Sequence, residues 1–273
     1  MQVCFSKYQG TGNDFILINN IDGAHDGLNL SQVGFLCDRK FGIGSDGLIL
    51  INKSEDYDFA MVFYNPDGSQ SFCGNGARCA VQFAGSEGLL SSSSVSFEGC
   101  DGVHQAELCG VDVKLQMSFL KAPMPIDPKK QDIQPYKEAY FMDTGAPHFG
   151  VFVSDLKHLQ SEHVLVFGKK IRFGAPYAHS GVNVNLIYVD RPGQLRIATY
   201  EKGVEYETLS CGTGATACAL IYAATESLPN DSVSIHTKGG MLRVSFDTKA
   251  DGTFSQVYLI GPAILIYEGK ISI

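Results

Sequence analysis

Short apolar runs recur along the chain and are separated by glycine, asparagine, aspartate and proline. These runs are rich in β-branched residues or alternate apolar with polar positions: DFILIN, GLILIN, VKLQMSFL, FGVFVSDL, VNVNLIYV, LRVSFD, VYLIGP and AILIY. Short segments of this kind between turn-forming residues are typical of β-strands. The pattern therefore predicts a chain built mainly of strands.

Few segments show a helical pattern. We predict helices over residues 31–39, 77–87 and 215–225. The last two begin where the phrases CGNGA (73–77) and CGTGA (211–215) end and small residues give way to an alanine-rich apolar stretch. Each phrase opens with a cysteine, Cys73 or Cys211, close to the predicted start of its helix.

The two halves of the chain repeat several features in the same order. Thr11-Gly12 and Thr144-Gly145 each precede an apolar run, and each half then carries one Cys-Gly-x-Gly-Ala phrase at nearly the same offset. Repeated features in a fixed order indicate a duplicated unit, and two copies are too few for a solenoid. We therefore predict an α+β fold, with mixed α/β content, made of two pseudo-symmetric domains.

The domain limits follow from this repeat. The first domain is predicted to span residues 1–119 and to be completed by C-terminal strands from residues 261–273. The second is predicted to span residues 120–260. The boundary falls near Leu120, before the proline- and lysine-rich segment KAPMPIDPKK, which is typical of a linker.

Composition narrows the class of protein. The 273 residues are 44% hydrophobic and 18% charged, with a net charge of −8 and no basic run, so we expect no nucleic-acid partner and no binding to an anionic membrane. No apolar stretch is long enough to span a bilayer. The start, MQVCFSKYQG, lacks the pattern of a signal peptide, so we expect a cytoplasmic protein whose eight cysteines are mostly free thiols.

The repeated cysteine phrase predicts a specific chemistry. A thiol at a helix N-terminus lies beside unsatisfied N–H groups and the positive end of the helix dipole, which lower its pKa from about 8.5 toward neutrality. The adjacent glycines let the backbone approach a carboxylate closely. Two such sites suit inversion at a carbon next to a carboxylate, with one thiolate removing the α-proton and the opposite thiol delivering another.

The remaining cysteines fit a structural role. Free cysteine is among the most buried residue types and packs as a small apolar side chain. Cys79 and Cys218 fall inside the two predicted helices next to the cysteine phrases, and the other four have no informative context. We expect all six to be buried: Cys4, Cys37, Cys79, Cys100, Cys109 and Cys218.

Other motifs argue against a cofactor or a metal. Gly42, Gly44 and Gly47 match G-x-G-x-x-G, but a predicted helix precedes them and a strand follows, which reverses the context of a dinucleotide site. The chain has no phosphate-binding loop and no lysine in a recognisable setting for pyridoxal phosphate. It also has no C-x-x-C pair and no histidine cluster at metal-ligand spacing. We predict catalysis without a cofactor or metal.

Several motifs resemble the diaminopimelate epimerase family: GTGNDFILIN, YNPDGSQSFCGNGARC, GAPHFGVFV and YEKGVEYETLSCGTGATA. The resemblance runs from Lys7 to the tail IYEGKISI. It implies two similar domains, each a β-barrel-like sheet around a central helix, with the substrate cleft between them. It also implies a homodimer that converts LL-diaminopimelate to meso-diaminopimelate without a cofactor, in the biosynthesis of lysine and peptidoglycan precursors.

The resemblance assigns roles to individual residues. Cys73 and Cys211 match the two acid–base thiols, and His148 with Glu201 matches residues that tune them. Tyr267 matches a tyrosine of the homodimer interface. The residues that match substrate-binding positions, including the amide cradles for the reacting carboxylate, are Asn13, Asn65, Gly74, Asn75, Asn183, Glu201, Lys202, Gly212 and Thr213.

Three departures from the family pattern bear on specificity. Ala146 stands where the family usually has asparagine, and Lys202 stands where it usually has arginine, which grips a carboxylate bidentately. The segment GVEYET is one residue longer than usual. These positions serve the distal end of the substrate in the family. Our hypothesis is that distal recognition is looser here and permits slow racemisation of glutamate or aspartate.

Two alternatives share the main features. A proline or hydroxyproline racemase resembles the same design with two thiols in a duplicated fold. A non-catalytic module for small dicarboxylates would use the two helix N-termini only as anion clamps. The GTGNDF motif and the asparagine-rich loops favour the epimerase, whereas a phenazine-type isomerase would share the fold without the cysteine pair.

Overall fold

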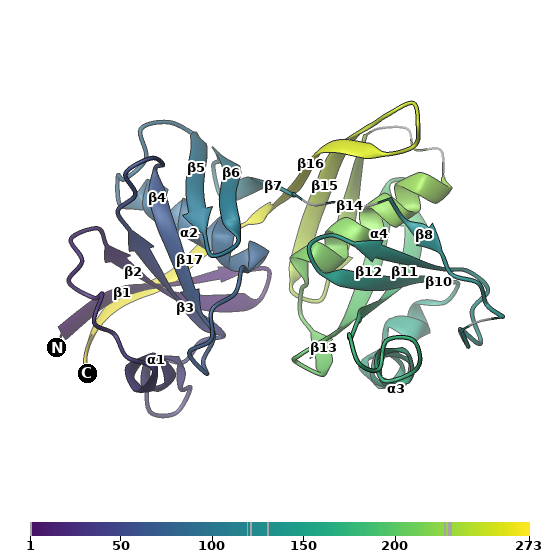
Figure 1. Ribbon diagram of the computed structural model, residues 1–273, viewed down its shortest axis with the longest axis horizontal. Coiled ribbons are helices and arrows are strands. Elements are labelled where there is room, and N and C mark those ends of the chain that lie inside the picture. The colour runs from purple at the N-terminus through teal and green to yellow at the C-terminus, as the bar shows by residue number, and fades with distance from the viewer. Residues whose placement is uncertain (1, 119, 121, 130, 227, 229–230) are drawn as a thin grey trace. The chain divides into compact units, whose positions relative to one another are not determined.

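The computed structural model describes the chain except residues 1, 119, 121, 130, 227 and 229–230. The chain forms two compact units (Figure 1): unit 1 is Met1–Gln116 with Gly261–Ile273, and unit 2 is Met117–Ile260. Residues 119 and 121, which flank the predicted boundary at Leu120, and Lys130 of the predicted linker lie outside the described residues. The predicted linker position therefore stays a prediction.

In unit 1, the strands of a mixed sheet pack around one central helix, α2. The neighbouring strands β1–β2, β3–β4, β5–β6 and β6–β7 are antiparallel. The neighbouring strands β2–β3 and β4–β5 are parallel. The tail strand β17 runs antiparallel to β1. The elements are β1 (Gln2–Gly10), β2 (Asn13–Asn20), α1 (Leu30–Cys37), β3 (Gly47–Asn52), β4 (Phe59–Tyr64), α2 (Gly74–Ser86), β5 (Ser94–Gly99), β6 (Gly102–Cys109), β7 (Asp112–Gln116) and β17 (Ile264–Ser272).

Unit 2 repeats this order of pairing. Strands β9–β10, β11–β12 and β14–β15–β16 are antiparallel, and β10–β11 and β12–β14 are parallel. The matching sequence of pairings confirms the predicted pseudo-symmetric α+β fold. The elements are β8 (Met124–Pro125), β9 (Ala139–Asp143), β10 (Pro147–Val153), η1 (Leu156–Leu159), α3 (Ser161–Arg172), β11 (Asn183–Arg191), β12 (Gln194–Glu201), β13 (Tyr206–Thr208), α4 (Gly212–Thr225), β14 (Ser232–Thr237), β15 (Gly240–Thr248) and β16 (Phe254–Pro262).

The central helices explain the apolar runs of the sequence. In unit 1, α2 contacts strands β1, β2, β3, β4, β6 and β7, and in unit 2, α4 contacts β9 to β12, β14 and β15. A second helix packs on the other face of each sheet, α1 on β3 and α3 on β11 and β12. In β2, Phe15 and Leu17 face the core around α2, whereas Ile16 and Ile18 face the core around α1. Strands buried on both faces give continuous apolar runs such as DFILIN.

The structure changes two of the helix predictions. Helices α2 and α4 begin at Gly74 and Gly212, earlier than predicted, so the glycines form the first turn and the cysteines themselves are the N-caps. Helix α3 was not predicted, although its buried residues recur with helical spacing. Gly168 weakens the helical signal there but is needed for packing, because a Cβ at this position would lie 2.5 Å from Cβ of Tyr200.

The cysteine predictions are partly wrong. Cys37, Cys79 and Cys218 are buried as expected, but Cys4, Cys100 and Cys109 are exposed. Exposure follows from position, since Cys4 lies on an alternating exposed position of β1 and the other two lie at or beside turns that flank β6. All eight are free thiols.

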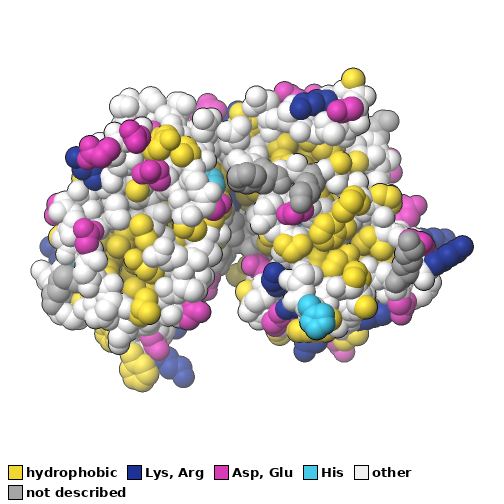
Figure 2. All heavy atoms as spheres, in the orientation of Figure 1, with side chains coloured by type: hydrophobic (Ala, Val, Ile, Leu, Met, Phe, Trp, Pro, Cys, Tyr) yellow, Lys and Arg dark blue, Asp and Glu magenta, His cyan; other side chains and the backbone are white. Residues whose placement is uncertain are grey.

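The face shown in Figure 2 carries acidic, basic and apolar side chains on both units. The apolar side chains gather in patches, with charged side chains mostly around them. Within the described part of the chain, no helix has the length and apolar character needed to cross a membrane.

Candidate active site

Each unit presents one cysteine at the start of its central helix. Cys73 caps α2 with φ −131° and ψ 112°, and Cys211 caps α4 with φ −120° and ψ 111°. Each cysteine carbonyl accepts the first helical hydrogen bond, from Ala77 or Ala215, at 2.8 Å. The N–H groups of the first turn have no partner within a helix, so both positions suit an anion beside the thiol.

The first half-site is formed by Cys73, Asn13 and Asn75. Asn13 Nδ2 donates to Asp46 Oδ2 at 2.6 Å, and Arg39 forms an ion pair with the same carboxylate at 2.7 Å. This fixes the amide so that Asn13 Oδ1 accepts from Asn75 Nδ2 at 3.2 Å and from Cys73 Sγ at 3.7 Å. The structure thus brings three of the predicted residues of unit 1 together.

Arg78 is a component of this half-site that the sequence analysis missed. It is fully buried, and burial lowers the pKa of its guanidinium. Its Nη2 donates to Asn75 Oδ1 at 3.0 Å and to Thr11 Oγ1 at 3.4 Å, which ties the helix to the β1–β2 turn. The signal in the sequence was that Arg78 is the single charged residue of this helix.

The second half-site is formed by Cys211, Thr213 and His148. Cys211 Sγ lies 3.4 Å from Thr213 Oγ1, which lies 3.0 Å from His148 Nε2. His148 has no exposed surface, and burial lowers its pKa to about 3, so the ring is neutral. Thr144 Oγ1 donates to the carbonyl of Thr213 at 3.1 Å and joins the β9–β10 turn to the helix.

Three predicted substrate-binding residues, Asn183, Glu201 and Lys202, lie at or next to the same end of β11 and β12. Asn183 Nδ2 donates to the carbonyl of Pro147 at 3.2 Å, and its Oδ1 accepts the Lys202 N–H at 2.9 Å. Lys202 Nζ donates to the carbonyl of Ser180 at 2.9 Å. Glu201 accepts a hydrogen bond from Thr208 on β13, with 2.8 Å between the oxygens.

Two further predicted residues contact other parts of unit 1. Asn65 Nδ2 donates within its own turn, to the carbonyl and hydroxyl of Ser69 and to the hydroxyl of Ser71. Tyr267 lies on β17, and its ring makes an edge contact with Phe5 at 6.0 Å.

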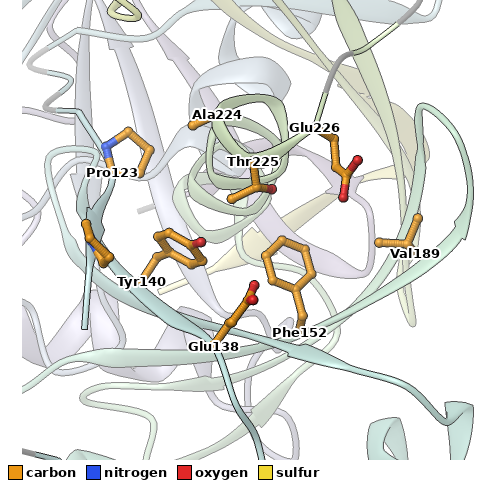
Figure 3. A pocket seen from close by; sticks show the side chains of 9 residues that line it. Pro123, Glu138, Tyr140, Phe152, Val189, Ala224, Thr225 and Glu226 are labelled. Atoms are coloured by element: carbon orange, nitrogen blue, oxygen red, sulfur yellow. The ribbon is translucent and has the colours of Figure 1, made fainter. Parts of the chain in front are cut away.

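A separate pocket lies within unit 2 (Figure 3). It has a volume of about 760 Å³ and contains none of the residues of the second half-site. The rings of Tyr140 and Phe152 and the carboxylates of Glu138 and Glu226 contribute to its wall. The remaining lining residues are Pro123, Pro125, Val189, Ala224 and Thr225.

The described residues do not form an obvious metal centre. Among them, no group of three or more histidine, cysteine, aspartate or glutamate side chains is arranged to hold a metal ion. The polar groups of the two half-sites are thiols, amides, hydroxyls, the Arg78 guanidinium and a neutral imidazole.

Solved structures share the fold. A phenazine biosynthesis protein of the PhzF family from Bacillus anthracis matches with a TM-score of 0.77 at 16% identity over the full length of both chains. A hydroxyproline epimerase from Agrobacterium vitis, with bound trans-4-hydroxy-L-proline, matches with a TM-score of 0.64 at 17% identity, covering 99% of this chain and 92% of that one.

Sequence comparison is more specific. The family model described as diaminopimelate epimerase matches residues 5–121 and 140–266. The diaminopimelate epimerase of Flavobacterium psychrophilum is 40% identical over 97% of this chain and 98% of its own length, and that of Chlorobaculum tepidum is 38% identical over 97% and 99%. The protein is thus an isomerase of the epimerase and racemase class. Within that class the chain belongs to the diaminopimelate epimerase family, whose place is in lysine biosynthesis.

Proposed function

We propose that the protein converts LL-diaminopimelate to meso-diaminopimelate with Cys73 and Cys211 as its acid–base pair and without a cofactor. The observation that carries this proposal is that both units share one feature: a cysteine is the N-cap of the central helix. Family membership favours this reaction over racemisation of proline or hydroxyproline and over passive binding of a dicarboxylate.

The mechanism uses one thiol on each face of the reacting carbon. A thiolate removes the α-proton, and the thiol on the other face gives its proton to the same carbon, so the configuration inverts. Negative charge builds on the adjacent carboxylate as the proton leaves. The N–H groups at the helix starts, Gly74-Asn75 and Gly212-Thr213, suit this carboxylate because N–H groups without a helical partner can donate to the charge that develops in the transition state.

The roles of the outer residues are part of the proposal. Asn13, Asn65 and Asn183 contact the substrate, and Glu201 contacts it near the thiols. Lys202 replaces a bidentate arginine and already donates to the carbonyl of Ser180, which supports looser recognition of the distal carboxylate. We place the reaction in the cytoplasm, where thiols stay reduced.

Cysteine variants test the proposal. Cys73→Ser and Cys211→Ser should each lower the rate of meso-diaminopimelate formation by about a hundredfold or more, because a serine hydroxyl is a far weaker acid than a thiol and hardly ionises near neutral pH. Chiral chromatography of the product measures this rate. Cys109→Ser removes an exposed thiol elsewhere in unit 1 and serves as the matched control.

The outcomes separate the candidate functions. Full activity in either active-site variant would contradict the two-thiol mechanism. The same assay with glutamate and aspartate tests specificity: slow racemisation supports looser distal recognition, and exclusive use of diaminopimelate rejects it.

A further inference from the structure

We propose that Asn185 is a positioning residue that sets the tautomer of His148, so that the hydroxyl of Thr213 donates a hydrogen bond to the Cys211 thiolate. The four residues Thr199, Asn185, His148 and Thr213 are called the Cys211 relay below. The inference rests on the proposed function of Cys211 as a base, and it adds residues to which no role has been given above. All members of the relay belong to unit 2.

The orientation of the Asn185 amide is fixed by its neighbours. Asn185 is fully buried on β11, and its Nδ2 lies 3.0 Å from the carbonyl oxygen of Phe149. A carbonyl oxygen only accepts hydrogen bonds, so the NH₂ group must face it. At the other end, Asn185 Oδ1 accepts from Thr199 Oγ1 at 2.9 Å. A Cβ on Gly214 would lie 2.7 Å from this Oδ1, so the glycine makes room for the amide beside the first turn of α4.

This amide determines which nitrogen of His148 carries the proton. Asn185 Nδ2 also lies 3.1 Å from His148 Nδ1 and donates to it, so Nδ1 must be unprotonated. Because the ring is fully buried and neutral, its single proton lies on Nε2. His148 Nε2 therefore donates to Thr213 Oγ1 at 3.0 Å.

The proton on His148 Nε2 sets the direction of the hydrogen bond between Thr213 and Cys211. With its oxygen accepting from His148, Thr213 has its own hydroxyl hydrogen to donate to Cys211 Sγ, 3.4 Å away. A hydrogen bond to a charged acceptor is roughly twice as strong as one between neutral groups, so this donor stabilises the thiolate over the thiol. When the thiolate takes the α-proton of the substrate, Cys211 becomes a thiol, and the relay itself gains and loses no proton.

Unit 1 has a different arrangement at the same position of its phrase. The residue two places after Cys73 is Asn75, an amide instead of a hydroxyl, and its Nδ2 donates to Asn13 Oδ1. The contacts of the relay lead to Cys211, so its removal should act on this thiol and spare Cys73.

The first test is spectroscopic and needs no substrate. Nitrogen-15 NMR of histidine-labelled protein reports the tautomer of His148, assigned by its loss in His148→Gln. We expect the Nε2–H tautomer in the unmodified protein and the Nδ1–H tautomer in Asn185→Asp, because a carboxylate accepts from Nδ1. An Nδ1–H ring in the unmodified protein overturns the proposal.

The second test measures thiolate reactivity at each cysteine. Iodoacetamide reacts with thiolates, and peptide mass spectrometry gives a separate rate for Cys211 and Cys73. Thr213→Val should slow alkylation of Cys211 by about tenfold and leave Cys73 unchanged, since it removes one hydrogen bond to a charged group. Thr213→Ser should restore the rate.

The matched control is Thr216→Val, which removes a buried hydroxyl on the same helix that donates only to the carbonyl of Gly212. It should not change the rate at Cys211. An unchanged rate in Thr213→Val, or equal slowing at both cysteines, overturns the proposal. Neither test requires turnover, so failure of the relay is distinguishable from failure of the proposed epimerase activity, which the Cys73→Ser and Cys211→Ser assays report.

Discussion

Arg78 combines a high cost of burial with a position beside the first half-site. No exposed surface remains on it, and among the described residues no carboxylate forms an ion pair with it. Taking an unpaired charge out of water is expensive, and apolar replacements of buried charges are often neutral or stabilising. Its hydrogen bonds to Asn75 and Thr11 hold groups that position Cys73, which is a reason to retain the charge.

Replacing Arg78 should separate stability from activity. We expect Arg78→Met to leave the thermal unfolding temperature unchanged or higher and to lower kcat/KM for LL-diaminopimelate by roughly tenfold or more, because Asn75 and Asn13 lose their fixed positions. Calorimetry and the epimerase assay measure the two effects. The control Arg196→Met removes an exposed arginine paired with Asp190. Lower stability with normal turnover would show that Arg78 has only a structural role.

At the scale of elements, most of the architecture could be predicted from the sequence. The apolar runs gave the strands, and the repeated cysteine phrase located the two central helices and both thiols. Helix α3 escaped prediction because Gly168, which lowers helical propensity, is required by contact with Tyr200. The Cys211 relay could not be predicted from the sequence either. The contact between His148 and Asn185 depends on the parallel register of β10 and β11, in which His148 lies opposite Asn183. Neither strand pattern alone fixes that register.

The tail strand β17 carries a prediction at this scale. Four consecutive apolar side chains at its start are about half exposed: Ile264, Leu265, Ile266 and Tyr267. We expect this surface to be the homodimer interface, since contiguous exposed apolar residues mark interaction sites. Tyr267→Glu should shift the protein from dimer to monomer in analytical ultracentrifugation, and Tyr267→Phe should not. A monomeric unmodified protein would reject the expectation.

At the scale of the whole molecule, duplication explains why one chain has two thiols of the same local design. The two units share their order of strand pairing and each caps its central helix with a cysteine, yet their surroundings differ. Cys73 lies beside amides and a buried guanidinium, whereas Cys211 lies at the end of a neutral hydrogen-bond relay. Inversion requires both an acid and a base, so a duplicated thiol that has diverged in its neighbours suits the reaction.

Solvent isotope incorporation tests the central claim most directly. In heavy water, a two-thiol mechanism takes the α-proton on one thiol and delivers a solvent-derived deuteron from the other. At early times, meso-diaminopimelate formed from the LL isomer should carry deuterium at the inverted carbon, while the remaining LL substrate stays unlabelled. Mass spectrometry of the separated isomers measures both pools. Product without deuterium, or equal early labelling of substrate and product, would contradict the account.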